Sequence, residues 1–299
     1  MAEWQDKKAT IGKMRLHYLD WGTKGKPTML LLHGGGQSAH SWDEFSRAMR
    51  RDYHVIALDQ RGHGDSAWSK NGTYTLAAHQ QDIHGFVTKL NLRNITLIGL
   101  SMGGRNSYVY ASKHPERIKR LVIVDVAPDI LKKGGRNIQR FTSKADILPS
   151  LEAFVERAHK FNPRRPLEQL RERLSHHLRK VPDGRWTWKY DTRFRGSETK
   201  SMRKKENLWP AVRRIKAPTL IVRGEVSDIL SPSQARRLQK AIKGSHLVEI
   251  ANAGHTVNGD NPQAFTAAVQ SFLMATDKNL MPAQGQPGVR WLDGFDGLG

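Results

Sequence analysis

The residues that could do chemistry begin with one serine between glycines. The stretch "GLSMG" (99–103) has the pattern G-x-S-x-G, and it follows an apolar run and precedes a helix-like segment. Glycines on both sides permit a sharp turn that holds the serine oxygen out over the edge of a sheet, where it can attack a carbonyl group. The alternative is a glycine-rich turn whose serine only caps the helix. We predict that Ser101 is a nucleophile.

A serine nucleophile needs a base, and that base needs a carboxylate to orient it. His255, in "AGHTVNGDNP", follows a strand-like run and lies on a loop that can reach the carboxyl end of a sheet. Asp228, in "RGEVSDILSP", follows another such run and is the predicted acid. Glu225 in the same loop and Asp125 at the end of "RLVIVD" are the alternatives. We therefore predict a catalytic triad of Ser101, His255 and Asp228.

Three consecutive glycines suggest a binding site for the negatively charged oxygen of the reaction. The stretch "LLLHGGGQSAHSW" ends an apolar run with His33 and then exposes backbone N–H groups that no side chain shields. We expect the N–H groups of Gly35 and Met102 to form the oxyanion hole, and Gly36 to contact substrate. The stretch has neither the P-loop lysine nor the G-x-G-x-x-G spacing, which counts against nucleotide binding.

The elements that must position these residues alternate along the chain. Apolar or alternating runs predict strands at 13–22, 28–34, 54–59, 94–100, 120–127, 217–224 and 246–251. Apolar residues at spacings of three and four predict helices at 38–51, 75–92, 105–118, 231–242 and 262–275. Strands that alternate with helices imply a largely parallel sheet with helices on both faces.

These motifs, in this order, resemble the α/β-hydrolase fold superfamily. The matching pieces are "LLHGGGQ", "ALDQRGHGDS", "GLSMGG", "IVRGEVSD" and "AGHTVNGDNP". The resemblance implies a mostly parallel, twisted, eight-stranded sheet and a mainly helical cap inserted after the sixth strand. It assigns 1–128 and 218–277 to the core, 129–217 to the cap and 278–299 to a C-terminal extension. It also implies that Ser101, Asp228 and His255 act without a metal or an organic cofactor.

Departures from particular subfamilies narrow the chemistry. Dehalogenases and epoxide hydrolases of this fold carry an aspartate where this chain has Ser101, and haloperoxidases usually carry a tryptophan in place of Gly35. Carbon–carbon bond hydrolases differ at the positions of Leu100 and Thr256, and dienelactone hydrolases need a cysteine, which this chain lacks. Hydrolysis of a small ester or lactone remains. A carbon–carbon bond or amide hydrolase, or a non-catalytic receptor on the same scaffold, is the alternative.

The positive charge of the chain is concentrated in the predicted cap. The 299 residues carry a net charge of +21, and segment 129–217 holds 24 Lys and Arg against 10 Asp and Glu. A strongly basic segment is consistent with a solvated surface, with attraction of anionic substrates or with binding of nucleic acid. Within "RWTWKYDTRFRG" (185–196), we expect Trp186 and Trp188 to contact substrate. No nucleic-acid partner is predicted.

The two ends of the chain give expectations for the cellular location of the protein and for the structural order of its tail. The first residues, "MAEWQDKKATIGK", are charged where a signal peptide would be apolar, and no apolar run is long enough to span a bilayer. We expect a cytoplasmic protein without a membrane partner, as a monomer or homodimer. The tail from 278 onward is rich in glycine and proline, so we expect a poorly ordered extension unless Trp291, Leu292 and Phe295 dock.

Overall fold

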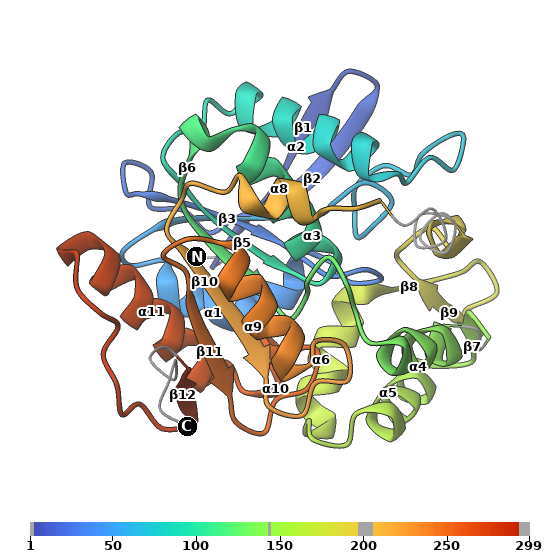
Figure 1. Cartoon of the computed structure of the whole chain (residues 1–299). Coiled ribbons are helices and arrows are strands. Elements are labelled where there is room, and N and C mark those ends of the chain that lie inside the picture. The colour runs from blue at the N-terminus through green and yellow to red at the C-terminus, as the bar shows by residue number, and fades with distance from the viewer. Residues whose placement is uncertain (1–2, 143–144, 197–205, 293–299) are drawn as a thin grey trace.

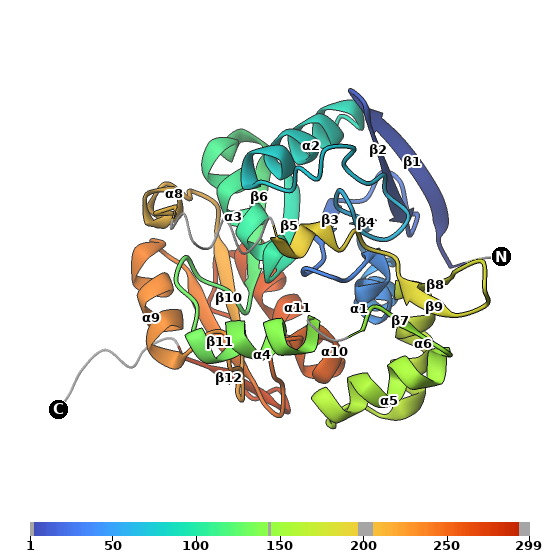
Figure 2. The same ribbon diagram turned by 90° about the vertical axis from the view of Figure 1, so that its right-hand side faces the viewer.

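A long mixed sheet lies between two layers of helices (Figures 1 and 2). The computed structural model describes residues 3–142, 145–196 and 206–292. In this part of the chain nine strands form the sheet, in the order β1-β2-β4-β3-β5-β6-β10-β11-β12. Their bounds are β1 (Gln5–Ile11), β2 (Met14–Asp20), β3 (Thr28–Leu32), β4 (His54–Leu58), β5 (Ile95–Leu100), β6 (Ile118–Val124), β10 (Thr219–Gly224), β11 (His246–Ile250) and β12 (Val289–Trp291).

The strand directions confirm the predicted mostly parallel sheet. The six strands from β4 to β11 run parallel to one another, and β1, β2 and β12 pair antiparallel at the two edges. The predicted number of eight strands is one too few, because the C-terminal tail adds β12 beside β11. Burial of Trp291 accounts for this docking, since its side chain packs into the core between the sheet and α11 (Pro262–Lys278). Phe295 lies outside the described residues.

Helices cover both faces of the sheet, as the alternating pattern predicted. One face packs against α2 (Leu76–Lys89), α3 (Met102–Lys113), α8 (Trp209–Arg213) and α9 (Pro232–Ala241). The other face packs against α1 (Asp43–Met49) and α11. Short helical turns η1 (Ala39–Trp42), η2 (Pro115–Arg117) and α10 (Val257–Asp260) complete the core. No helix of the described residues has the length and apolar character to cross a bilayer.

The chain between β6 and β10 builds a second, smaller unit with a core of its own. It contains α4 (Lys132–Thr142), β7 (Ile147–Leu148), α5 (Leu151–Phe161), α6 (Leu167–His177), β8 (Leu178–Lys180) and β9 (Trp186–Trp188). Three of these elements form a small antiparallel sheet in the order β7-β9-β8. In both views α4, α5 and α6 lie on the side of the molecule opposite to α2 (Figures 1 and 2).

The end of the predicted cap segment belongs to the main core by its packing. Trp209 and Val212 of α8, with Ile215 just after it, are buried in the same apolar cluster as α2 and α3. The smaller cluster of the inserted unit instead gathers residues of α5, α6, β8 and β9, with Phe154 and Trp188 among them. The inserted unit is called the cap from here on, and α8 is counted with the core.

Candidate active site

Ser101 lies in a strained turn between β5 and α3. Its backbone has φ +55° and ψ −114°, a left-handed conformation that costs roughly 1–3 kcal/mol for a residue with a side chain. The flanking glycines make the turn possible. A Cβ at Gly99 would lie 2.4 Å from the carbonyl oxygen of Gly103, and one at Gly103 would lie 2.2 Å from that of Leu32. The turn therefore holds the serine hydroxyl at the carboxyl end of a central strand.

His255 faces this hydroxyl from the loop between β11 and α10. Its Nε2 atom lies 2.9 Å from Ser101 Oγ, although 154 residues separate the two along the chain. The loop is fixed by the buried carboxylate of Asp260, which accepts hydrogen bonds from the Gly254 N–H at 2.9 Å and from Arg165 at 2.7 Å. Arg165 belongs to the cap, so a cap residue helps to position the histidine. The structure thus brings together the two predicted residues Ser101 and His255.

The carboxylate beside His255 belongs to Asp125, so the expectation that Asp228 contacts His255 is wrong. Oδ2 of Asp125 lies 2.8 Å from His255 Nδ1. The carboxylate is fully buried and also accepts hydrogen bonds from Ser227 Oγ at 2.5 Å and from the Gly224 N–H at 3.1 Å. Asp228 instead accepts a hydrogen bond at 2.7 Å from Asn137, on α4 of the cap.

Strand order explains why Asp125 occupies this position. It is the first residue after β6, which lies directly beside the serine strand β5, whereas β10 lies one strand farther away. A left-handed turn at Asp125, with φ +50°, bends the chain sharply at the strand end. In the loop after β10 it is Ser227 whose side chain faces Asp125, while Asp228 points toward the cap. Ser227 and Asp228 are adjacent in this loop, but one side chain contacts Asp125 and the other contacts the cap, which reverses the predicted assignment.

The glycine loop lies against the serine turn, as an oxyanion hole requires. A Cβ at Gly34 would be 3.5 Å from the Cβ of Ser101, and one at Gly35 would be 4.0 Å from the Cβ of Met102. His33 holds the start of this loop. Its Nδ1–H donates to the Gly34 carbonyl at 2.7 Å, and its Nε2 accepts the Gln60 N–H at 3.0 Å. Burial lowers the pKa of His33, which keeps the ring in the neutral form that can make both bonds.

Two aromatic residues of the cap cover the glycine loop. A Cβ at Gly35 would lie 3.1 Å from the Phe194 ring, and one at Gly36 would lie 3.5 Å from the Tyr190 ring. Phe194 is buried in a cluster with Tyr74 and Met102. The cap therefore places apolar surface directly above the two backbone groups predicted to bind the oxyanion.

The two tryptophans predicted to contact substrate lie elsewhere. Trp188 packs inside the cap, with its ring 4.9 Å from that of Phe154. Trp186 is half-buried and lies 5.6 Å from the Lys180 ammonium. The aromatic residues of this stretch that reach the core are Tyr190 and Phe194, two and six positions after Trp188. The rings that approach the glycine loop are therefore those of Tyr190 and Phe194, while the contact of Trp186 and Trp188 with substrate stays a prediction.

Hydrogen bonds and an ion pair at Asp191 hold this part of the cap against the core. The Tyr74 hydroxyl donates to Asp191 at 2.5 Å, and Arg193 donates to the same carboxylate at 2.7 Å. The backbone N–H of Asp191 donates to the Gly62 carbonyl at 2.8 Å. Burial raises the pKa of Asp191, but the hydrogen bonds from Arg193 and Tyr74 outweigh burial and hold that pKa below its usual value. The contacts of Asp191 thereby fix the position of Phe194, which lies three residues later in the chain.

Three residues that support the site were not identified from the sequence. Asp260 lies five residues after His255, inside the motif that identified the histidine, and an acid so close was a usable signal. Ser227 adjoins the predicted acid, and its neutral side chain gave no signal of a role in the triad. Arg165 gave no signal, because its partner Asp260 lies 95 residues away.

Two groups of side chains among the described residues could hold a metal ion, and both lie outside the triad. One consists of His40, Asp43 and His176, and the other of His17, Asp59 and Asp65. Ser101, His255 and Asp125 belong to neither group. The arrangement around Ser101 supplies a nucleophile, a base, an orienting carboxylate and backbone N–H groups, which are the parts needed for acyl transfer.

Known proteins resemble this chain in sequence and in fold. A family model described as alpha/beta hydrolase fold matches residues 27–262. Esterase Rv0045c of Mycobacterium tuberculosis is 28% identical over 264 residues, which cover 85% of each chain. The structure of E-2-(acetamidomethylene)succinate hydrolase matches with a TM-score of 0.81 at 25% identity, over 91% of this chain and 100% of that one. The enol-lactonase from Burkholderia xenovorans matches with a TM-score of 0.71 at 25% identity, over 90% and 100%.

Proposed function

Because the chain belongs to the α/β-hydrolase fold family, we propose that it hydrolyses small carboxylic esters or lactones through an acyl-enzyme on Ser101. The observation that carries this proposal is the continuous chain of contacts from Ser101 Oγ through His255 to Asp125, at 2.9 and 2.8 Å. A protein that only bound a ligand would gain nothing from a strained serine aligned with a histidine and a buried carboxylate.

In the first half of the reaction, His255 Nε2 removes the proton of Ser101 Oγ, and the oxygen attacks the carbonyl carbon of the ester. The N–H groups of Gly35 and Met102 stabilise the negative charge that develops on the carbonyl oxygen. Asp125 keeps the Nδ1 proton of His255 in place and stabilises the imidazolium that forms. The imidazolium then protonates the leaving alkoxide, and the alcohol departs.

In the second half, water attacks the acyl-enzyme. His255 takes the proton of the water molecule, the same backbone N–H groups stabilise the second oxyanion, and Ser101 leaves with the proton that His255 returns. The products are the carboxylic acid and free enzyme. For a lactone, the alcohol and the acid remain one molecule, so a single hydroxy acid is released.

The position of the cap supports the proposal that the substrate is small and partly apolar. Phe194 and Tyr190 cover the glycine loop at van der Waals distance and leave little height above Gly35 and Gly36. The similar proteins named as an esterase and an enol-lactonase support the choice of ester or lactone bonds.

Ion pairs within and around the cap indicate that many of its Lys and Arg side chains have a structural role. Ion pairs tie several of them to carboxylates, among them Arg165–Asp260, Arg171–Glu152, Arg185–Asp183, Lys189–Asp65, Arg193–Asp191 and Arg195–Asp146. Cations held in this way contribute less net field to attract an anionic substrate. We therefore expect kcat/KM for an anionic ester to depend only weakly on salt.

The decisive experiment is hydrolysis of p-nitrophenyl acetate, butyrate and octanoate and of a set of lactones, at 20 and 500 mM NaCl. The proteins are wild type, Ser101→Ala and the control Ser112→Ala, which removes a hydroxyl at the far end of the same helix. We expect wild type and Ser112→Ala to turn over at least one ester or lactone. We expect Ser101→Ala to lose at least about 10³-fold in kcat, because the nucleophile is absent.

Labelling by a fluorophosphonate probe provides an independent measurement. Wild type and Ser112→Ala should be labelled, and Ser101→Ala should not. Turnover that survives in Ser101→Ala would contradict the proposed mechanism. Absence of both turnover and labelling in wild type would favour a receptor on this scaffold, and cleavage of amides alone would favour the amide-hydrolase alternative.

A further inference from the structure

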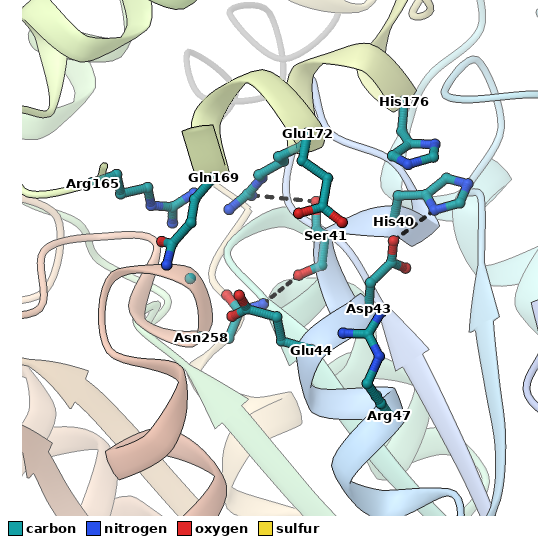
Figure 3. A pocket seen from close by; sticks show the side chains of 12 residues that line it. His40, Ser41, Asp43, Glu44, Arg47, Arg165, Gln169, Glu172, His176 and Asn258 are labelled. Atoms are coloured by element: carbon teal, nitrogen blue, oxygen red, sulfur yellow. Dashed lines mark hydrogen bonds and ion pairs between the residues drawn. The ribbon is translucent and has the colours of Figure 1, made fainter. Parts of the chain in front are cut away.

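The joint between α6 of the cap and η1 of the core contains a cluster of ionisable side chains away from the triad. A pocket of about 90 Å³ opens here, and His40, Asp43, Glu44, Glu172 and His176 are among its lining residues (Figure 3). Three arginines also line it, and each has a partner: Arg47 with Glu3, Arg165 with Asp260 and Arg173 with Ser41. This volume accommodates an ion together with several water molecules. Neither Ser101 nor His255 lines it.

Three of these side chains converge from two separate parts of the fold. His40 Nδ1 lies 2.8 Å from Asp43 Oδ2, and the His40 and His176 rings stack with centroids 3.8 Å apart and an interplanar angle of 17°. Each residue is half-buried, and one possible ligand atom from each lies within 4.8 Å of the other two. His40 and Asp43 come from the core, and His176 comes from the end of the cap helix α6.

His176 offers a nitrogen lone pair that the protein does not use. Among the described residues its ring makes aromatic contacts with His40 and Trp4 but no hydrogen bond. A neutral imidazole is the form that binds a metal ion.

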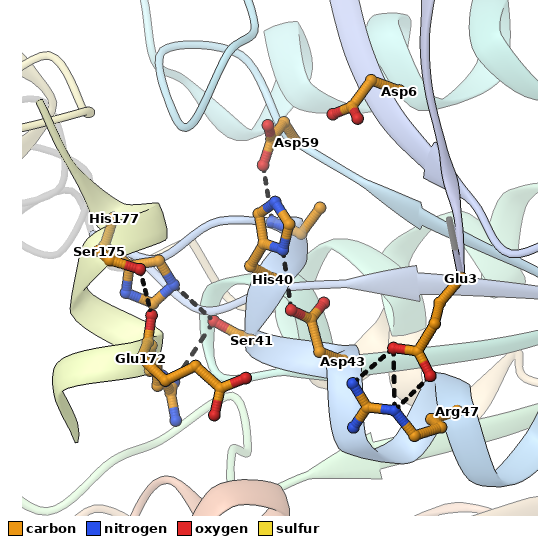
Figure 4. Close-up of polar contacts among 12 residues, drawn as sticks. Glu3, Asp6, His40, Ser41, Asp43, Arg47, Asp59, Glu172, Ser175 and His177 are labelled. Carbon is orange, nitrogen blue, oxygen red and sulfur yellow. Dashed lines mark hydrogen bonds and ion pairs between the residues drawn. The ribbon is translucent and has the colours of Figure 1, made fainter. Parts of the chain in front are cut away.

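The adjoining contacts hold the two parts at this spacing. His177, next to His176, places its Nε2 3.4 Å from Ser41 Oγ, and Arg173 donates to the same oxygen at 3.3 Å. The Arg47 guanidinium pairs with Glu3 close by (Figure 4). The backbones that carry the cluster are therefore already docked, and binding of an ion requires the His40 and His176 rings to rotate out of their stacked arrangement.

The second candidate group lacks this freedom. Both ring nitrogens of His17 are engaged, Nδ1 with Asp59 at 2.7 Å and Nε2 with Asp6 at 3.0 Å. The Asp59 carboxylate also accepts the N–H groups of Ala39 and Asp65, at 2.6 and 2.9 Å. These bonds complete a structural network, so a metal would have to replace several of them.

We propose that His40, Asp43 and His176 form a binding site for a divalent transition metal ion such as Zn²⁺, and that the bound ion fastens the cap to the core. Two imidazoles and one carboxylate suit Zn²⁺, Ni²⁺ or Cu²⁺, whereas Mg²⁺ and Ca²⁺ prefer oxygen ligands. Metal–ligand bonds of about 2.0–2.2 Å draw ligand atoms to within roughly 4 Å of one another, which requires a shift of about 1 Å here. Water completes the coordination.

The ion has a predicted effect on the reaction, and this part rests on the proposed function. Residue 40 lies four positions after Gly36, so η1 continues directly from the glycine loop beneath Phe194 and Tyr190. Fastening α6 to η1 restricts the movement of the cap over that loop. Substrate entry and product release then slow, because both require the cap to move. Zn²⁺ should lower kcat without reacting at Ser101.

The binding test uses isothermal titration calorimetry with ZnCl₂ and thermal melts of the full chain. We expect one Zn²⁺ per chain and a rise in Tm of about 5 °C at a hundredfold excess of Zn²⁺ over Kd. MgCl₂ should produce neither. His176→Gln and Asp43→Asn should bind Zn²⁺ at least tenfold more weakly and lose the rise in Tm, while melting without metal as wild type does.

A matched control is provided by a second stacked histidine pair. His84 and His114 stack at 4.4 Å with an interplanar angle of 19°, and Glu116 lies 3.6 Å from His114, but this pair lies wholly within the core. His84→Gln should retain the full Zn²⁺ response. Equal Zn²⁺ binding by wild type, His176→Gln and Asp43→Asn would overturn the proposed site.

Measurements of kcat with and without Zn²⁺ separate the proposed hydrolase function from the proposed metal site. If Zn²⁺ lowers kcat in wild type and not in His176→Gln, the ion acts through the joint. If inhibition persists in His176→Gln, Zn²⁺ acts elsewhere and the proposed fastening is wrong. If no substrate is found, the proposed hydrolase function fails, but calorimetry and melting still decide whether the metal site exists.

Discussion

Two loops at the carboxyl end of the sheet each offer an aspartate, and the two side chains contact different parts of the molecule. Asp125, after β6, is fully buried and contacts His255, Ser227 and the backbone of Gly224. Asp228, after β10, is half-buried and contacts the cap residue Asn137. Both follow an apolar strand that ends near the serine. The position of a carboxylate along the chain therefore limits which residues could orient His255. The direction of each side chain in the folded protein determines which of them does so.

The same contrast recurs in three other matched pairs. Ser227 contacts Asp125 and Ser233 is exposed, and both follow β10 within ten residues. His79 is buried and His84 is exposed, on the same helix α2. Phe194 covers the glycine loop and Trp186 lies away from it, in the same stretch of the cap. In each pair the member that faces inward should carry the effect, and the four predictions below test this from the largest effect to the smallest.

The largest effect is expected at the acid. Asp125→Asn removes the charge that stabilises the His255 imidazolium and permits the wrong tautomer, so kcat should fall by about 10³- to 10⁴-fold. Asp228→Asn should change kcat by less than about threefold. Steady-state kinetics on one p-nitrophenyl ester measures both. Loss of activity in Asp228→Asn rather than in Asp125→Asn would contradict the assignment of Asp125 as the acid.

The second prediction concerns stability and pH. Burial lowers the pKa of His79 well below its ordinary value, and nearby cations lower it further. Below about pH 6.5 the unfolded chain binds a proton at this residue and the folded chain does not, so the stabilisation present above that pH is lost as pH falls. His79→Gln should remove about 2 kcal/mol of the decrease in unfolding free energy between pH 7 and pH 5.

Urea denaturation of wild type, His79→Gln and His84→Gln at the two pH values measures this difference. The exposed His84 lies on the same helix, and its replacement should leave most of the pH dependence in place. An identical decrease in all three proteins would show that burial of His79 does not govern the acid sensitivity of the fold.

The third prediction concerns the hydroxyl that supports the acid. Ser227→Ala removes the hydrogen bond to Asp125 Oδ2, and a bond to a charged group is worth about 1.5–3 kcal/mol. We expect kcat to fall about tenfold with little change in KM, because the Gly224 N–H still holds the carboxylate. Ser233→Ala is the control and should act as wild type. A change in KM alone would assign Ser227 to substrate binding instead.

The smallest effect is expected at the aromatic cover. Phe194→Ala opens space above Gly35 and Met102, so KM for acetate esters should rise about three- to fivefold while longer acyl chains lose less. Trp186→Ala should leave the preference for acyl length unchanged. Kinetics on acetate, butyrate and octanoate esters tests the pair. A shift in preference with Trp186→Ala would return that residue to the substrate site.

The sequence determined the order of strands and helices, the serine turn and the loop that carries His255. These follow from local rules, because glycine spacing dictates a sharp turn and apolar periodicity dictates buried strands. Gly99 and Gly103 illustrate this, since any side chain at either position would meet backbone atoms. The nucleophile and the base could therefore be named before any contact was known.

Only the tertiary structure decided which carboxylate meets His255, which aromatic residues reach the site and that the tail adds a ninth strand. These depend on strand neighbours and on side-chain direction across 130 residues in the case of Asp125 and His255. A displacement of one residue changes which partner a side chain meets, as Ser227 with Asp125 and Asp228 with Asn137 demonstrate. The physical reason is that local patterns fix the backbone path, whereas long-range packing fixes which side chains meet.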